Sequence, residues 1–335
     1  MIDAATAVSR LIELQRAVRD VVLRSHGSTA NQVTRSMQAD TIYAIDADVE
    51  PVIEEFCREW SKTTPLVLIA EGVENEEEYG GEEGIKVFPE GAKESDAQIR
   101  LIIDPIDGTR QIMYDKRSAW SLAGVAPNKG AVTRLSDIEV AVMTELPTSK
   151  AGYGDVLWAV KGRGVQARRV DLRDKSERPM IFSSSQATNI SHGYASISNF
   201  FPGTKVLAGE VMEHLVRHLI GPADVTRATV FEDQYISTAG QFYELIVGHD
   251  RFNADLRPIF YKIQNQPEGL CCHPYDCAAM LIATEAGILL TDGLGSPLDG
   301  PLDVTTGISW AAYANPQLRE VIEPILTSCL RELGA

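Results

Sequence analysis

The hexapeptide DPIDGT at residues 104–109, which directly follows the apolar run at 101–103, constrains this chain more than any other feature. The apolar run predicts a buried strand. Pro105 fixes its own φ and biases Asp104 toward extended geometry, so we expect Asp104 to finish the strand before the chain turns. An ordinary turn is the alternative interpretation, because Asp-Gly is also a common hairpin signal.

The same segment places oxygen ligands beside backbone donors. Its two carboxylates, Asp104 and Asp107, lie next to a main-chain carbonyl, and such oxygen groups suit a hard divalent cation. Gly108 permits close backbone approach, and Thr109 can cap a helix whose first N–H groups suit a phosphate. The segment therefore predicts metal-assisted phosphate chemistry.

Length, composition and charge limit the classes of protein to which this chain can belong. The 335 residues, 44% of them hydrophobic, suffice for two domains with full cores. We see no apolar stretch of the roughly 20 residues that a membrane span needs, and no secretory signal. Five cysteines without framework spacing favour a reducing compartment, so we expect a cytoplasmic protein. The net charge of −16 argues against a nucleic-acid polymer as partner.

Hydrophobic periodicity predicts both helices and strands. We expect helices at 5–25, 47–60, 209–220, 237–247, 276–286 and 316–328. We expect strands at 41–45, 65–70, 99–103, 121–126, 138–144, 156–160, 179–183 and 287–291. Residues 72–97, rich in Gly and Glu, are predicted to be a mobile connection. Residues 161–164 are predicted to be a turn, for which a hairpin connection and an anion site both stay open.

This order of elements favours an α+β chain with an antiparallel sheet in the first half and a mixed sheet with helices in the second. We expect a boundary near residue 180. An N-terminal α+β domain at 1–180 would then carry most of the candidate ligands, and a C-terminal α/β domain at 181–335 would carry Asp276.

Acidic residues stand where predicted elements begin or end, which is where α/β architectures build their sites. These residues are Asp46, Glu71, Asp104, Asp107 and Asp276. Taken singly, Asp46 and Asp276 are typical of helix N-caps, and Glu71 can simply begin an acidic loop. Together they point to a cation, because buried strands seldom end repeatedly in uncompensated carboxylates.

Segment 104–109 resembles a signature of the inositol monophosphatase superfamily of magnesium-dependent, lithium-sensitive phosphatases. Segments at 45–50, 69–71, 159–165 and 275–292 are similar to further parts of the family pattern and occur in the same order. The resemblance covers residues 40–335 approximately. It implies a layered αβαβα fold and a homodimer.

The resemblance also implies a ligand set for Mg²⁺, with Mn²⁺ as a substitute. One ion would be held by Glu71, Asp104 and the carbonyl of Ile106. A second would be held by Asp104, Asp107 and Asp276, with Asp104 as the bridge, and a third, weaker ion would sit at Glu71.

The catalytic roles follow from the same resemblance. Asp46 and Thr109 would orient and deprotonate the attacking water, and the N–H groups of Gly108 and Thr109 would bind phosphate oxygens. These roles agree with the chemistry, because hydrolysis of a phosphate monoester needs an in-line water and charge neutralisation. A threonine alone is a weak base, so its pairing with a carboxylate makes physical sense.

The sequence departs from the family pattern at several points, of which the length of the segment at 253–269 leaves the substrate open. Gly72 follows Glu71 where many members have a second acidic residue, which makes Glu74 the alternative ligand. Tyr275 stands where the family usually has Trp. The segment at 253–269 is longer than in simple members and falls where the family selects its substrate.

Other conspicuous residues have two interpretations each. The sequence CCH at 271–273 looks like a transition-metal cluster, but packing is favoured because no second pair at zinc spacing accompanies it. The loop at 114–117 either contacts substrate or is simply solvated. Arg251 and Arg257 are candidates for binding a second anionic group, with a surface role as the alternative.

We therefore expect an enzyme, a Mg²⁺-dependent phosphatase that hydrolyses an inositol phosphate or a sugar phosphate. The alternative is a bisphosphate phosphatase acting on 3′-phosphoadenosine 5′-phosphate or fructose 1,6-bisphosphate. A non-catalytic relative that binds a ligand or partner is the third hypothesis. The expected partner is a small phosphorylated metabolite, with no nucleic-acid polymer and no membrane.

Overall fold

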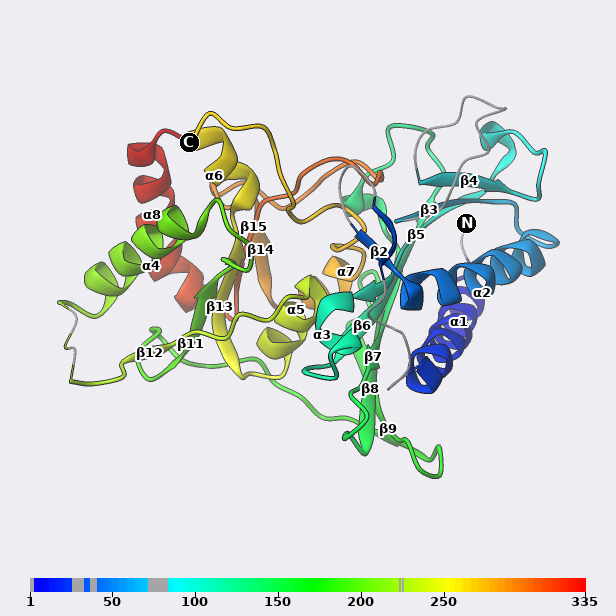
Figure 1. The fold of residues 1–335 in the computed structure, drawn as a ribbon, viewed down its shortest axis with the longest axis horizontal. Helices are drawn as coiled ribbons and strands as arrows, with labels where there is room; N and C mark the ends of the chain where they lie inside the picture. The colour runs from blue at the N-terminus through cyan, green and yellow to red at the C-terminus, as the bar shows by residue number, and fades with distance from the viewer. Residues whose placement is uncertain (1–2, 26–32, 37–40, 72–83, 223, 225) are drawn as a thin grey trace. The chain divides into compact units, whose positions relative to one another are not determined.

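The computed structural model describes residues 3–25, 33–36, 41–71, 84–222, 224 and 226–335. The chain forms two compact units, and each unit has a large sheet of its own (Figure 1). The first unit comprises Met1–Ile181, His273–Glu285 and Gly300–Thr306. The second comprises Phe182–Cys272, Ala286–Asp299 and Gly307–Ala335.

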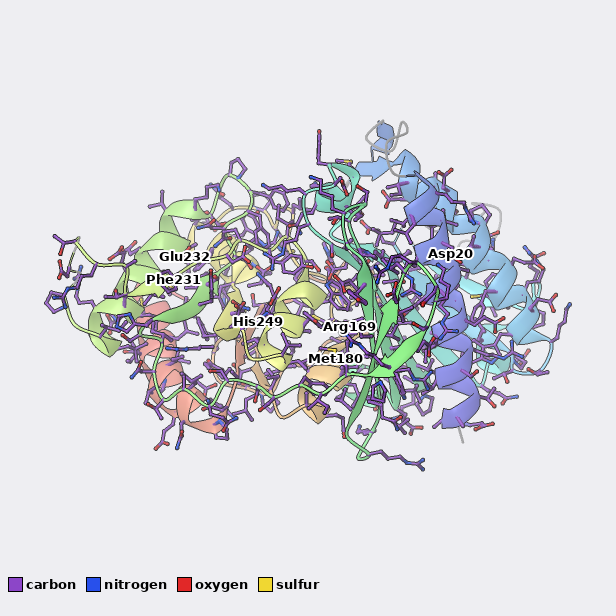
Figure 2. All side chains as sticks on the ribbon, turned by 90° about the horizontal axis from the view of Figure 1, so that it is seen from below. Asp20, Arg169, Met180, Phe231, Glu232 and His249 are labelled. Atoms are coloured by element: carbon purple, nitrogen blue, oxygen red, sulfur yellow. The ribbon has the colours of Figure 1, made fainter. Side chains whose placement is uncertain are left out.

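An eight-stranded sheet with the order β10-β9-β8-β7-β6-β5-β3-β4 forms the centre of the first unit. Its strands are β3 (Leu66–Ala70), β4 (Ile85–Phe88), β5 (Ile99–Asp107), β6 (Ala119–Pro127), β7 (Val140–Leu146), β8 (Tyr153–Val160), β9 (Val165–Asp171) and β10 (Glu177–Pro179). Neighbours are antiparallel except for the parallel pair β3 and β5. One edge of the sheet lies at β10, near Arg169 and Met180 (Figure 2). A separate ribbon pairs β1 (Val33–Ser36) with β2 (Thr41–Tyr43).

Helices α1 (Ala4–Ser25) and α2 (Ala44–Ser61) lie side by side on one face of this sheet (Figure 1). Apolar residues recur along them at helical spacing, such as Leu11 and Val18 in α1 and Val49 and Ile53 in α2, and these side chains are buried. Alternate residues of the strands, such as Leu101, meet them in a single core cluster. The opposite face of the sheet is thereby left for other contacts.

Two short helices complete the first unit. Helix α3 (Thr109–Met113) directly follows β5, and α7 (Met280–Glu285) packs against β7 and β8. The segment that carries α7 and Asp276 therefore belongs to the first unit, which corrects the expectation that Asp276 lies in the C-terminal domain. The physical reason is close packing, because this segment makes its contacts with the first sheet.

The second unit contains a five-stranded mixed sheet with the order β12-β11-β13-β15-β14. Its strands are β11 (Gly193–Ile197), β12 (Val230–Phe231), β13 (Asp250–Asp255), β14 (Leu289–Thr291) and β15 (Trp310–Tyr313). β11 is parallel to β12 and β13, and β15 is antiparallel to β13 and β14. Phe231 marks the edge at β12 (Figure 2).

The helices of the second unit are α4 (Lys205–Leu219), α5 (Thr238–Ile246), α6 (Arg257–Ile263) and α8 (Pro316–Leu333). Helices α4 and α8 pack together on one side of the sheet, and α5 covers the other side (Figure 1). Across the described part of the chain, no helix combines the length and apolar character that a membrane crossing requires.

The α+β class agrees with the sequence, but several elements differ from those expected. The strand expected at 179–183 is corrected, because Ile181 is 97% exposed and only Pro179 lies in a strand. The helix expected at 276–286 begins only at Met280. The sequence also missed β4, β9, β11, β13 and β15. Strand β13 shows why, because Asp250, Asn253 and Asp255 are buried there with polar partners, so its composition hides its position in the sheet.

Candidate functional site

A bulge in β5 brings Asp104 and Asp107 to the same face of the first sheet. Asp104 pairs with Leu122 of β6, whereas Asp107 pairs with Trp120, so two residues of β5 oppose the single residue Ser121. In a regular strand, residues three apart point to opposite faces. The extra residue of the bulge removes that difference, so both carboxylates leave the sheet on one side.

Pro105 and Ile106 form this bulge. Proline fits the position because a bulged residue needs no ladder hydrogen bond. The side chain of Ile106 is 4% exposed and joins the core under α1 and α2. The strand extends to Asp107, which corrects the expectation that it ends at Asp104.

Asp276 adds a third carboxylate to this pair. One oxygen atom from each of Asp104, Asp107 and Asp276 lies within 4.8 Å of the others. Backbone N–H groups hold two of them, because Ile106 donates to Asp104 Oδ1 at 3.0 Å and His273 donates to Asp276 Oδ2 at 2.6 Å. Two of the three carboxylates are buried and the third is partly buried, so the structure brings three of the predicted ligands together within one unit.

The charges of this cluster disfavour ionisation. Burial raises the pKa of the Asp104 carboxyl well above its usual range, and the charges of Asp107, Asp276 and Glu71 raise it further. The hydrogen bond from Ile106 acts in the opposite direction. Such crowding costs free energy unless a cation compensates it.

The donor set fits a hard divalent cation. Carboxylate oxygens are the ligands that Mg²⁺, Mn²⁺ and Ca²⁺ prefer, and this cluster offers no sulfur. Glu71 follows β3 and acts on Asp104 through its charge, but among the described residues it is not a member of the three-carboxylate group. Glu74, the alternative ligand to Glu71, lies outside the described residues.

The structure also brings Asp46 and Thr109 together, although they are 63 positions apart. The Thr109 hydroxyl oxygen lies 3.2 Å from Asp46 Oδ1 and 2.8 Å from the carbonyl oxygen of Ile106. Asp46 lies in the first turn of α2, which begins at Ala44, so the strand expected at 41–45 ends earlier. A carboxylate in this turn is favoured by the helix dipole.

Gly108 connects β5 to α3. Its φ of 101° lies in the left-handed region, which glycine adopts without the steric cost of a Cβ atom. The first hydrogen bond of α3 runs from Gln111 N–H to the Gly108 carbonyl at 2.9 Å. The N–H groups of Gly108 and Thr109 precede that bond, which is where a helix start presents donors to an anion.

The sequence CCH at 271–273 does not form a transition-metal cluster. The only group of metal-ligating side chains found in the described ranges is the aspartate cluster. Cys271 and Cys272 are buried, and Cys272 Sγ accepts a hydrogen bond from Thr238 at 3.7 Å. The His273 ring instead stacks on Tyr275, with centroids 5.4 Å apart.

The loop at 114–117 is attached to the turn after β7. The Asp115 carboxylate accepts hydrogen bonds from the N–H and the hydroxyl of Ser149, at 2.7 Å and 2.6 Å. The Tyr114 side chain is 68% exposed. The loop therefore combines a fixed backbone with one exposed aromatic ring.

Arg251 and Arg257 have partners within the second unit. Arg251 donates to the carbonyl oxygens of Asn189 and Ser191. Arg257 binds the Asp255 carboxylate and donates to the carbonyl oxygen of Leu270 at 3.1 Å. Both guanidinium groups thus support the fold of this unit.

We expect Arg257→Ala to destabilise the protein by about 3–5 kcal/mol, because it leaves the Asp255 charge buried without a partner. The two side chains are only 6% and 1% exposed. The control is Arg173→Ala, which breaks an ion pair whose arginine is 72% exposed, and we expect little change there. Urea unfolding of both variants measures the difference, and similar losses would contradict the expectation.

No family model and no curated protein matches this sequence. Solved structures match the fold over nearly its whole length. An IMPase of Thermotoga maritima matches with a TM-score of 0.62 at 16% identity, covering 98% of this chain and 100% of that chain. The fructose-1,6-bisphosphatase of Leishmania major, in holo form, matches with a TM-score of 0.65 at 15% identity, covering 97% and 93%.

The extragenic suppressor protein suhB of Bartonella henselae matches with a TM-score of 0.63 at 17% identity, covering 96% of this chain and 98% of that chain. The chain therefore has the layered αβαβα fold of these structures. This is the fold that the sequence motifs predict.

Proposed function

We propose that this protein is a metal-dependent phosphoric monoester hydrolase of the inositol monophosphatase superfamily. The observation that carries the proposal is the cluster of Asp104, Asp107 and Asp276, whose crowded carboxylates call for a divalent cation. The fold likeness to an IMPase and to a fructose-1,6-bisphosphatase supports it. The proposed substrate is a small inositol phosphate or sugar phosphate.

The proposed cation is Mg²⁺, with Mn²⁺ as a substitute. Glu71, Asp104 and the Ile106 carbonyl hold one ion, and Asp104, Asp107 and Asp276 hold a second, with a third and weaker site at Glu71. When bound, these ions neutralise charge on the phosphoryl oxygens and lower the pKa of a bound water. The shared role of Asp104 is supported by its proximity to two carboxylates and by the effect of the Glu71 charge on it.

Asp46 and Thr109 orient and deprotonate the attacking water. The single Thr109 proton has two acceptors in the structure, Asp46 and the Ile106 carbonyl. Because the Ile106 carbonyl is proposed as a metal ligand, the Thr109 hydroxyl donates its hydrogen bond to Asp46 and passes that proton to the Asp46 carboxylate as the water is deprotonated. A lone pair of Thr109 then accepts the proton of the water, and the N–H groups of Gly108 and Thr109 bind phosphate oxygens. No covalent phosphoenzyme is needed.

A monoester is preferred over a bisphosphate because Arg251 and Arg257, the candidates for a second anionic group, already have partners. A bisphosphate, either 3′-phosphoadenosine 5′-phosphate or fructose 1,6-bisphosphate, remains the second candidate. The likeness to the Leishmania fructose-1,6-bisphosphatase favours it at the level of fold. A non-catalytic relative is disfavoured because the Asp46–Thr109 pair and the aspartate cluster are both intact.

We expect the purified protein to release phosphate from at least one member of a panel of inositol phosphates, sugar phosphates and the two bisphosphates. EDTA should abolish the release, and excess Mg²⁺ or Mn²⁺ should restore it, because the carboxylate cluster cannot neutralise a phosphate without a cation. A colorimetric phosphate assay measures this. Release that persists in EDTA, or no release from any substrate, would refute the proposed function.

Lithium inhibition and a homodimer belong to the same proposal on the strength of the family resemblance, and a cytoplasmic location belongs to it because of the five cysteines without framework spacing. A lithium dose series on the Mg²⁺-dependent activity tests the first. Light scattering on the purified protein tests the homodimer.

A further inference from the structure

The turn that carries Asp276 lies directly on β6. A Cβ atom built on Gly124 of β6 would lie 3.0 Å from the carbonyl oxygen of Ala278 and 2.8 Å from Cδ1 of Ile138. The Ile138 atom is the end of a flexible side chain, whereas the Ala278 oxygen belongs to the backbone of the turn. The missing side chain at Gly124 therefore sets how closely this turn approaches the sheet.

The far end of the same segment is held by a carboxylate. Glu285, the last residue of α7, accepts hydrogen bonds from the N–H groups of Gly162 and Gly164, each at 2.7 Å. These glycines have φ values of 75° and 70°, and successive N–H groups in such a turn form a concavity that binds anions. Both interpretations of residues 161–164 apply. These residues connect β8 to β9 as a hairpin, and the hairpin binds an anion of its own chain, the Glu285 carboxylate.

Asp276 is linked to both anchors through a short and tightly packed stretch of chain. Cys277, Ala278 and Ala279 are fully buried, and Ala278 N–H donates to the Tyr275 carbonyl at 3.1 Å. Helix α7 then leads to Glu285 along β7 and β8. Because packed interiors transmit small displacements, a shift at either anchor moves the Asp276 carboxylate.

We propose that Gly124 and Glu285 are positioning residues for Asp276, and that they set the affinity of the site for its divalent cation. The inference rests on the proposed function. Mg²⁺ demands near-ideal octahedral geometry, so displacement of one ligand by a few tenths of an ångström weakens binding. Residues that orient ligands typically change metal affinity by about 10- to 100-fold when they are replaced.

The test compares Gly124→Ala and Glu285→Gln with wild-type protein. The first variant pushes Ala278 off the sheet. The second leaves one side-chain oxygen for two N–H donors and turns an amide toward one of them. Calorimetric titration of the metal-free protein with Mg²⁺ and with Mn²⁺ measures affinity, and we expect a loss of about 10-fold in each variant.

Two controls separate positioning from general damage. Gly154→Ala adds a Cβ atom whose nearest neighbours lie 3.6 Å away, an ordinary contact, so its metal affinity should equal that of wild type. Val18→Ala removes buried volume under α1, on the other face of the sheet, and should lower the melting temperature without changing metal affinity.

Wild-type affinity in both Gly124→Ala and Glu285→Gln would overturn the positioning role. The positioning role would also be overturned if Val18→Ala, at an equal loss of melting temperature, lost as much metal affinity as Gly124→Ala and Glu285→Gln. If wild-type protein binds neither Mg²⁺ nor Mn²⁺, the proposed function itself fails, so the two failures can be told apart.

Discussion

Asp104→Asn is expected to abolish phosphatase turnover and, at the same time, to make the metal-free protein more stable. The activity falls because the variant loses the ligand proposed to bridge two ions, an effect of several kcal/mol, or about 10³-fold in rate. At pH values above the raised pKa of Asp104, the stability rises because the variant removes one charge from a buried cluster of carboxylates. The asparagine oxygen can still accept the hydrogen bond from Ile106, so the bulge should persist.

The pH dependence of this stability has a definite sign. The pKa of Asp104 in the folded, metal-free protein lies well above its ordinary value of 3.8. The folded state therefore binds this proton more tightly than the unfolded chain does. The contribution of Asp104 protonation to the free energy of unfolding is complete below the ordinary carboxyl pKa. It is lost as the pH rises through the raised pKa of the folded state. Wild-type protein should show this loss, and Asp104→Asn should lack it.

Thermal unfolding with EDTA and with saturating Mg²⁺, repeated across pH, measures both effects. Added metal should raise the melting temperature of wild type but not of Asp104→Asn. The matched control is Asp137→Asn, since a hydrogen bond from Lys129 lowers the pKa of Asp137 and its removal should be slightly destabilising. An Asp104→Asn protein that is less stable without metal, or that keeps near-normal turnover, would rule out this role.

Thr109→Val and Asp46→Asn are expected to reduce kcat by about 10²–10⁴-fold while leaving metal affinity close to that of wild type. The Thr109 hydroxyl lies within hydrogen-bond reach of Asp46, so either change breaks the pair that would accept the proton of the water. Neither side chain belongs to the three-carboxylate cluster found in the described residues, which is why binding and turnover should separate.

Single-turnover phosphate release and metal titration, performed on the same preparations, measure this separation. Combining the two changes should cost little more than either alone, because residues that act as one unit lose their effect together. Thr6→Val is a matched control, since its hydroxyl also donates to an aspartate, Asp3, at 2.5 Å on the surface of α1. The assignment fails if the double variant shows the product of two independent losses, or if metal affinity falls in parallel with kcat.

Local sequence patterns predicted much of the first sheet because several of its strands have a clear hydrophobic pattern. Leu66 to Ala70 and Leu101 to Ile103 are continuous apolar runs, and they form the buried parallel pair β3 and β5. The spacing of apolar residues in α1 and α2 is typical of helices with one buried face, and it matches the observed core. These elements are determined by neighbours in sequence.

Other features depend on partners that are distant in sequence. Strand β13 is polar in composition, with Asp250, Asn253 and Asp255, and it becomes a buried central strand only by pairing with β11 and β15, which are distant in sequence. The anion bound by the turn at 161–164 is Glu285, which lies more than a hundred positions away. The extended Asp104 was expected to end its strand, whereas pairing with β6 continues the strand through a bulge.

The amino-acid order thus determined which chemical groups are available: carboxylates next to strand ends, a glycine that permits a left-handed turn, and a threonine at a helix start. These properties are local, because each follows from side-chain chemistry and the allowed backbone angles of a few residues. Only the tertiary structure decided that one oxygen atom from each of Asp104, Asp107 and Asp276 lies within 4.8 Å of the others, because strand register, a bulge and the packing of a distant segment bring them together. Coulombic interactions act through space, so the repulsion between carboxylates that calls for a cation arises only once the chain has folded.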